Sequence, residues 1–158
     1  MDALGSAAVP CVPTDPRILP LIEAHLTLMY ASSPACSVHA MDASALEDAG
    51  AEFVAVFDGE RAMAMGALKV HDDELGELKS MHVASDSRGA GLADTVLEAL
   101  LEKARKLGLR RISLETGSQD AFEPARRFYE RRGFEPSPPF ADYTDDPASV
   151  YYTCILEL

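Results

Sequence analysis

The sequence has few cations and few cysteines, and it lacks any long apolar run. Its 158 residues hold 14 Lys+Arg against 26 Asp+Glu, a formal net charge of −12. This balance argues against a general binder of nucleic acid or anionic membranes, because both classes need a basic surface to meet phosphate. Nothing approaches the roughly 18 uninterrupted apolar residues of a membrane span. We therefore expect neither nucleic acid nor a membrane as a partner.

The three cysteines, Cys11, Cys36 and Cys154, are widely spaced and odd in number. No disulfide framework or CxxC metal site can be built from them, and the four histidines show no metal-ligand spacing. We therefore expect a reducing compartment and no metal. The N-terminal residues lack the basic and apolar regions of a signal peptide, so a cytoplasmic location is expected.

What the chain does have is an ordinary globular composition, with 47% hydrophobic and 25% charged residues. A chain of this size corresponds to one domain, expected over residues 1–158. Its cations are unevenly placed, because residues 88–132 hold ten of the fourteen beside seven acidic residues. An anionic ligand would find its basic partners in that segment.

The first half predicts two helices and then an antiparallel meander. Thr14-Asp15-Pro16 is typical of a helix start, and Ser44 with Glu47 has the spacing of a capping box in a second helix. Asp58-Gly59 is a hairpin signal. Strands are expected over 52–57, 62–70 and 77–83.

The second half predicts a crossover in which a glycine loop at 87–91 leads from a strand into a helix that ends at Gly108. A strand at 111–116, a helix at 124–132 and a closing strand at 150–156 follow. Such a crossover makes strands 77–83 and 111–116 parallel neighbours. The expected fold class is α/β (α+β), a single domain whose mixed sheet joins an antiparallel meander to a βαβα unit.

A glycine loop between a strand and a helix is a phosphate-binding arrangement, because main-chain N–H groups and the helix dipole both favour an anion. The P-loop needs Lys-Ser/Thr where Leu92-Ala93 stand, and the dinucleotide fingerprint needs a glycine where Asp94 stands. The pattern Arg88-x-x-Gly91-x-Ala93 instead resembles the Arg/Gln-x-x-Gly-x-Gly/Ala signature of the GCN5-related N-acetyltransferases (GNAT).

Two further features strengthen the resemblance. Residues 125–134 are similar to the family's second signature, an Ala–Tyr–Gly-Phe pattern, and the element order matches over nearly the whole chain. Segments 76–81, 114–118 and 139–143 resemble a bacterial branch of acetyltransferases whose label says little about the acceptor. One departure is Phe122, which stands where many members carry an asparagine that contacts coenzyme A.

The resemblance implies acetyl-CoA as the co-substrate. It implies that the Met81 N–H polarises the acetyl carbonyl, that Val83 pairs with the pantetheine amide, and that Tyr129 is the general acid for the departing thiolate. It also implies a main-chain binding site for the pyrophosphate, made by Arg88, Gly89, Ala90, Gly91, Leu92 and Ala93.

The candidate base is Glu77, which lies eleven residues before Arg88, the offset of the base in histone-acetylating members. A water chain is the alternative, as in many members of the family. Strict alternation along strand 77–83 puts Glu77 and Lys79 on one face with Met81 and Val83, and His82 on the other. Glu77 and His82 therefore should not serve one pocket, and a structural role is expected for His82.

The acceptor site is expected to include Glu115, with His39, Phe140 and Tyr143 in loops that could close over it, where packing is the more expected role. The predicted function is transfer of an acetyl group from acetyl-CoA to a primary amine of a small molecule or peptide, by direct attack in a ternary complex. A non-catalytic acyl-CoA-binding sensor on the same fold is the alternative. The sequence leaves the oligomeric state open, and a homodimer is compatible with it.

Overall fold

The computed structural model describes residues 7–34 and 40–156. The first half contains β1 (Val9–Pro10), α1 (Leu19–Ser32), α2 (Ala43–Asp48), β2 (Glu52–Asp58), β3 (Arg61–Val70), β4 (Leu75–Val83) and the short 3₁₀ helix η2 (Ser85–Ser87). The second half contains α3 (Leu92–Lys106), β5 (Arg111–Gly117), the 3₁₀ helix η3 (Asp120–Phe122), α4 (Glu123–Arg131), β6 (Glu135–Ser137) and β7 (Ser149–Ile155).

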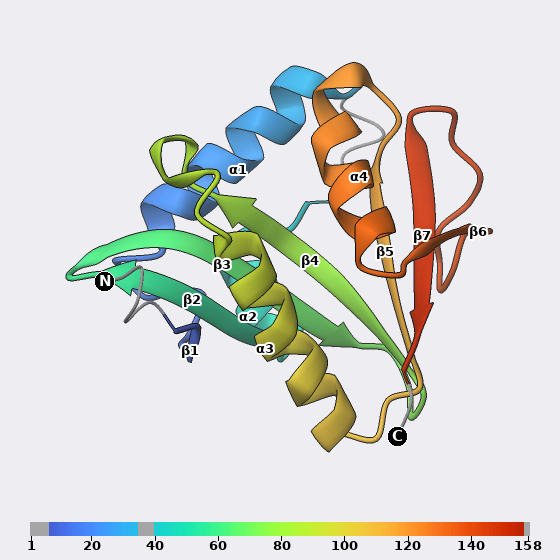
Figure 1. Cartoon of the computed structure of the whole chain (residues 1–158), viewed down its shortest axis with the longest axis horizontal. Coiled ribbons are helices and arrows are strands. Elements are labelled where there is room, and N and C mark those ends of the chain that lie inside the picture. Colours follow the sequence, from blue (N-terminus) through green and yellow to red (C-terminus); the bar gives the residue numbers. More distant parts are fainter. Residues whose placement is uncertain (1–6, 35–39, 157–158) are drawn as a thin grey trace.

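The strands form one seven-stranded sheet in the order β1-β2-β3-β4-β5-β7-β6. Strands β2, β3 and β4 pair as an antiparallel meander, and β4 and β5 are parallel neighbours. Helices α3 and α4 pack on one face of the sheet, and α1 and α2 pack on the other (Figure 1). The predicted mixed α/β fold and its parallel strand pair are therefore confirmed.

Helix α3 is the main packing element of the first face. Its apolar positions recur at the spacing of one helical stripe, and the buried ones are Leu92, Val96, Leu97, Leu100, Leu101 and Ala104. Full burial of one leucine contributes about 1.5–3 kcal/mol, so this stripe fixes the helix firmly on the sheet. Its N-terminus is thereby held beside the end of β4.

Strands β4 and β5 pair over a short distance and then separate. Their registered pairs run from Leu75–Arg111 to Glu77–Ser113, whereas β5 stays paired with β7 along its whole length. Figure 1 shows the two strands meeting at one end and diverging toward the other. The divergence opens the middle of the sheet just beyond Glu77.

A β-bulge interrupts β4 at Ser80, whose φ of 57° lies in the left-handed region. Lys79 pairs with Ala67 and His82 pairs with Met65, so Ser80 and Met81 both face Gly66. An extra residue in one strand reverses the alternation of the side chains that follow it.

The strict alternation predicted for this strand is therefore wrong. Met81 and Val83 pack on the α3 face together with Leu78, whereas His82 meets α1 on the opposite face. His82 consequently shares a face with Glu77, and the two residues line the same cavity.

Two helix starts also differ from expectation. α1 begins at Leu19 rather than at Thr14–Pro16, because Pro20 has no N–H to donate to Pro16, as a helix running from residue 16 would require. In α2 the capping side chain is Asp42, which accepts from the Ala45 N–H at 2.8 Å.

The predicted capping box of α2 is therefore wrong. Ser44 lies inside the helix, and the Glu47 carboxylate accepts instead from the Thr14 hydroxyl at 2.7 Å. Within the described ranges, no helix combines the length and apolar character needed to cross a membrane.

Candidate active site

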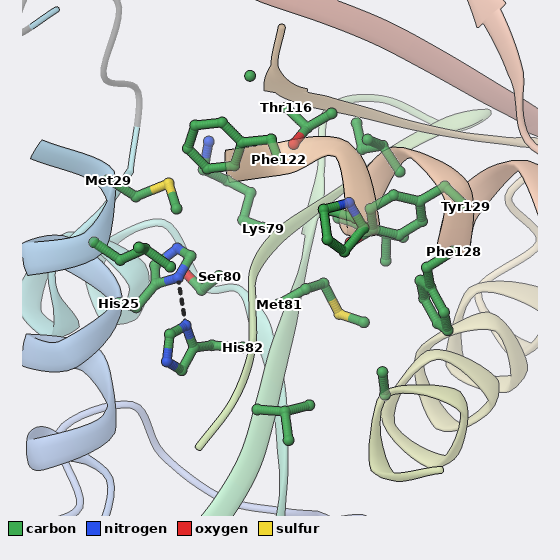
Figure 2. A pocket seen from close by; sticks show the side chains of 18 of the residues that line it. His25, Met29, Lys79, Ser80, Met81, His82, Thr116, Phe122, Phe128 and Tyr129 are labelled. Atoms are coloured by element: carbon green, nitrogen blue, oxygen red, sulfur yellow. Dashed lines mark hydrogen bonds between the residues drawn. The ribbon is translucent and has the colours of Figure 1, made fainter. Parts of the chain in front are cut away.

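The opening between β4 and β5 is a cavity of about 510 Å³. Its walls come from α1, β4, the loop that leads into α3, the end of β5, η3 and α4 (Figure 2). The cavity thus connects the α3 face of the sheet with the α1 face, which is the arrangement expected where two substrates approach one another from opposite sides.

The glycine loop forms the α3 side of this cavity. Gly89 and Gly91 have φ values of 86° and 77°, a region that favours glycine, and α3 begins directly after Gly91. The loop therefore presents a helix N-terminus to the cavity, where an anion is stabilised by the helix dipole and free N–H groups. Asp94 in the first turn is ion-paired with Arg132, which offsets its repulsion of an anion.

Eight residues were predicted to bind the cofactor. Seven of these eight line the cavity: Met81, Val83, Arg88, Gly89, Gly91, Leu92 and Ala93. Ala90 belongs to the same loop but does not line the cavity. The α3 face and the end of β4 thus bring nearly all of the predicted cofactor residues together.

Tyr129 lies on α4 and reaches the cavity wall from a buried position. Its ring packs edge-on against Phe128 and Phe134, with centroid distances of 5.2 and 5.5 Å. Burial raises the pKa of its phenol above the ordinary value, so the hydroxyl keeps its proton at neutral pH. A protonated phenol at this wall is suited to donate a proton to a leaving group.

Phe122 is buried at the wall between β5 and α4 and lines the cavity (Figure 2). A Cβ added at Gly117 would lie 2.1 Å from its ring, so the glycine is needed for the ring to sit there. The phenyl ring cannot form the polar contact with coenzyme A that the family resemblance implies for an asparagine at this position.

Glu77 is buried at the point where β4 and β5 separate, and its carboxylate already accepts from three donors. His71 Nε2 lies 2.8 Å from Oε1, while the Tyr143 hydroxyl and Lys79 Nζ lie 2.6 and 3.3 Å from Oε2. Burial and the nearby Glu77 charge raise the pKa of the Tyr143 hydroxyl, which keeps it a donor. Lys79 Nζ also lies 3.2 Å from the Tyr143 oxygen.

The other predicted acceptor residues occupy different positions. Glu115 lines the cavity and accepts from the Ser149 hydroxyl at 2.8 Å. Tyr143 lines a neighbouring cavity that shares Glu77 and Lys79 with the first. Phe140 packs against Tyr143, with 5.0 Å between the ring centroids, and it lines neither of these two cavities. His39 lies outside the described residues.

Two histidines, His25 on α1 and His82 on β4, meet at the cavity edge and point toward one another (Figure 2). Their Nδ1 atoms are 3.1 Å apart, and their rings stack edge to face. Burial, followed by the proximity of His82 and Lys79, lowers the pKa of His25 to about 4. Burial and Arg88 lower the pKa of His82.

Comparison with known proteins identifies the family. The model of the acetyltransferase (GNAT) family matches residues 18–134. The uncharacterised N-acetyltransferase YsnE of Bacillus subtilis is 41% identical over 140 residues, covering 89% of this chain and 93% of the relative. This chain belongs to the GNAT acetyltransferase family.

Further relatives agree with the assignment. The uncharacterised N-acetyltransferase YedL of Escherichia coli is 38% identical over 143 residues, with 90% of each chain covered. A solved structure from Klebsiella pneumoniae, described as an acyl-CoA N-acyltransferase, has a TM-score of 0.82 at 27% identity and covers 96% of this chain and 98% of its own. The GNAT fold predicted from the sequence is confirmed.

The sequence did not predict the histidine contact in this GNAT acetyltransferase. His25 occupies a core-facing position of α1, and His82 was assigned to the opposite face from Glu77. A signal was available, because an apolar helix stripe that contains a histidine needs a polar partner for its ring nitrogens. In the described part of the chain, no group of three or more His, Cys, Asp or Glu side chains is arranged to hold a metal ion.

Proposed function

We propose that the protein transfers the acetyl group of acetyl-CoA to a primary amine of a small molecule or peptide, by direct attack in a ternary complex. The observation that carries the proposal is the cavity through the opened sheet. Its α3 side presents glycine N–H groups and a helix N-terminus, and its α1 side presents titratable side chains. A thioester on one side and an amine on the other could meet at the bulge in β4.

In this proposal the pyrophosphate binds at Arg88–Ala93, and the pantetheine arm follows β4 beyond Glu77, where pairing with β5 has ended. The Met81 N–H stabilises the oxyanion of the tetrahedral intermediate. The C–S bond then breaks, its electron pair goes to sulfur, and Tyr129 gives the thiolate a proton. With ordinary pKa values of ~10 for a phenol and ~8.5 for a thiol, that transfer is uphill by about 2 kcal/mol, so it is completed when the phenolate regains a proton.

Glu77 as the base stays a prediction. Its buried carboxylate lies at the acceptor end of the cavity, which supports a role there. Because the carboxylate already accepts from three donors, a direct base role requires the incoming amine to displace one of them. Glu115 is proposed as an acceptor contact, and Phe140 and Tyr143 as the wall that holds the Glu77 side in place. The cytoplasm is the proposed compartment, since it would keep the cysteines as thiols.

Two measurements on the purified protein test the proposed function. Calorimetry should show binding of acetyl-CoA, and a thiol reagent should report release of coenzyme A when a panel of amines, amino acids and polyamines is added. The absence of acetyl-CoA binding at millimolar concentration would contradict the proposal. Binding without release of coenzyme A for any amine would favour the acyl-CoA sensor, for which Phe122 at the usual asparagine position is the supporting observation.

A further inference from the structure

The contact between His25 and His82 joins two cavities of the protein. Both rings line the cavity between β4 and β5, and His82 also lines a second cavity of about 780 Å³ between α1 and the segment after β4. The bulge at Ser80 creates this arrangement, because it turns His82 toward α1 while its neighbour Met81 faces α3. His82 therefore directly follows Met81, whose N–H is proposed to hold the acetyl oxygen.

The Nδ1–Nδ1 contact restricts the proton positions of the pair. At 3.1 Å, one Nδ1 must carry a proton and the other must accept it. In neutral imidazoles the donor ring then has a lone pair on Nε2, and the acceptor ring has a proton on Nε2. The contact thus supplies one basic nitrogen and one N–H at the two ends of a short proton path.

The surroundings keep this pair neutral. The charged groups that act on it are Lys79, from β4, and Arg88, from the loop that follows β4. Both are cations, and His82 faces the uncharged Met65 on β3. The pair is therefore a free base at neutral pH, in contrast to the Glu77 carboxylate, which already accepts from three donors.

We propose that the His25–His82 pair takes the proton from the acceptor amine and passes it to the second cavity. This inference rests on the proposed function and assigns the base role to the pair in place of Glu77. His25, which lines only the first cavity of the two, is the catalytic residue that meets the amine. His82, which lines both, is the positioning residue that carries the proton onward.

The proton balance is complete without a co-reactant. In one concerted step, an ammonium proton moves to His25 Nε2, the Nδ1 proton of His25 moves to His82 Nδ1, and the Nε2 proton of His82 leaves into the second cavity. No imidazolium therefore forms on the His25 ring, whose pKa is lowered by burial to about 4. The neutral amine attacks the thioester carbon, and Tyr129 protonates the departing sulfur. The second amine proton returns through solvent to Tyr129, and proton exchange with water resets the two tautomers between turnovers.

The pH profile of kcat/KM tests the pair through His25→Asn and His82→Asn. Asparagine keeps a polar group near the Nδ1 position and removes Nε2, so it preserves a structural contact but breaks the proton path. With the amine found in the panel, each variant should be slower by about 10²-fold at pH 7. The deficit should shrink to less than about tenfold at pH 9.5, because an amine with a pKa near 10 then deprotonates in solution.

Two comparison variants sharpen this test. His71→Asn replaces a histidine that does not line the main cavity and should leave the shape of the profile unchanged. Glu77→Gln should give a deficit that does not depend on pH. The proposal is overturned if the histidine variants lose activity equally at all pH values, or if Glu77→Gln alone shows the deficit that closes at high pH.

Nitrogen-15 NMR of the full chain tests the pair without any acceptor. At pH 7 we expect one ring protonated on Nδ1, the other on Nε2, and neither charged. An imidazolium in either ring, or protons on both Nε2 atoms, would overturn the proposal even if acetyl-CoA binds. Conversely, if the tautomers are as expected but acetyl-CoA does not bind, the proposed function is contradicted while the assigned proton positions of the histidine pair stand.

Discussion

Most of the cavity side proposed for the cofactor comes from one continuous segment, whereas the side proposed for the acceptor draws on several separate segments. Met81–Ala93 supplies the end of β4, the glycine loop and the start of α3 in sequence order. The acceptor side combines His25 from α1, Lys79 from β4 and Glu115 from β5. A main-chain site tolerates changes of side chain, so the acceptor side is where related acetyltransferases can differ in specificity.

This contrast predicts that the two sides fail in different ways when a residue is replaced. Changes on the cofactor side should lower affinity for acetyl-CoA, and changes on the acceptor side should lower turnover or alter pH dependence. Tyr129 is the informative case at the boundary, because it lies on α4 outside the Met81–Ala93 segment, lines the same cavity and is proposed to act on the leaving group.

The largest effect is expected for Tyr129→Phe. Loss of the hydroxyl should lower kcat by about 10²–10⁴-fold, the usual contribution of a general acid, while the dissociation constant of acetyl-CoA stays within about twofold of native. Steady-state kinetics and calorimetry measure the two quantities. Tyr152→Phe is the matched control, since its buried hydroxyl donates to Glu130 outside the cavity at 2.7 Å. Equal losses in affinity and turnover would make Tyr129 a binding or packing residue.

The second effect concerns the stability that His25 contributes. Its pKa falls from 6.5 to about 4 on folding, so the neutral ring stabilises the fold above pH 6.5, and that stability is lost as the pH falls toward 4. The shift corresponds to about 3 kcal/mol. The free energy of unfolding in urea should therefore decrease more steeply for native protein than for His25→Gln between pH 7 and pH 4.5. Parallel curves for the two chains would contradict the buried, neutral state of His25.

The smallest effect is expected for Gly91→Val on the cofactor side. A β-branched residue at a φ of 77° costs about 1–2 kcal/mol, and relief of that strain should displace the loop N–H groups. Affinity for acetyl-CoA should fall about tenfold by calorimetry, since about 1.4 kcal/mol is a factor of ten. Gly108→Val carries the same strain at the far end of α3, where φ is 78°, and should lose stability but not affinity. Equal affinities of the two variants for acetyl-CoA would contradict a role of the glycine loop in binding it.

Local sequence signals predicted the elements that depend on local physics. The Asp58-Gly59 hairpin, the helix that ends before Gly108 and the closing strand all appear within a few residues of their expected bounds. The parallel pairing of β4 and β5 was predicted from the helix that connects them, because a strand–helix–strand crossover brings its two strands side by side in the same direction. β1 and β6 were not predicted, since each is too short to show a pattern of its own.

The error in β4 arose because one residue changed the face of the sheet toward which the following side chains point. Alternation with a period of two placed His82 away from Glu77, but the bulge at Ser80 adds one residue and reverses the pattern. Nothing in the segment Lys79-Ser80-Met81 marks that bulge, because a serine there adopts a positive φ only under the pairing that β3 and Gly66 impose.

The sequence alone determined the family and the order of the elements, and it predicted a cofactor side, because these rest on contiguous residues whose spacing carries the information. Only the tertiary structure decided the acceptor side. It brought His25 to within 3.1 Å of His82 across 57 residues, and it placed three donors on the buried carboxylate of Glu77. Contacts between distant segments depend on how helices pack on a bulged and divided sheet, and no spacing within one segment records that packing.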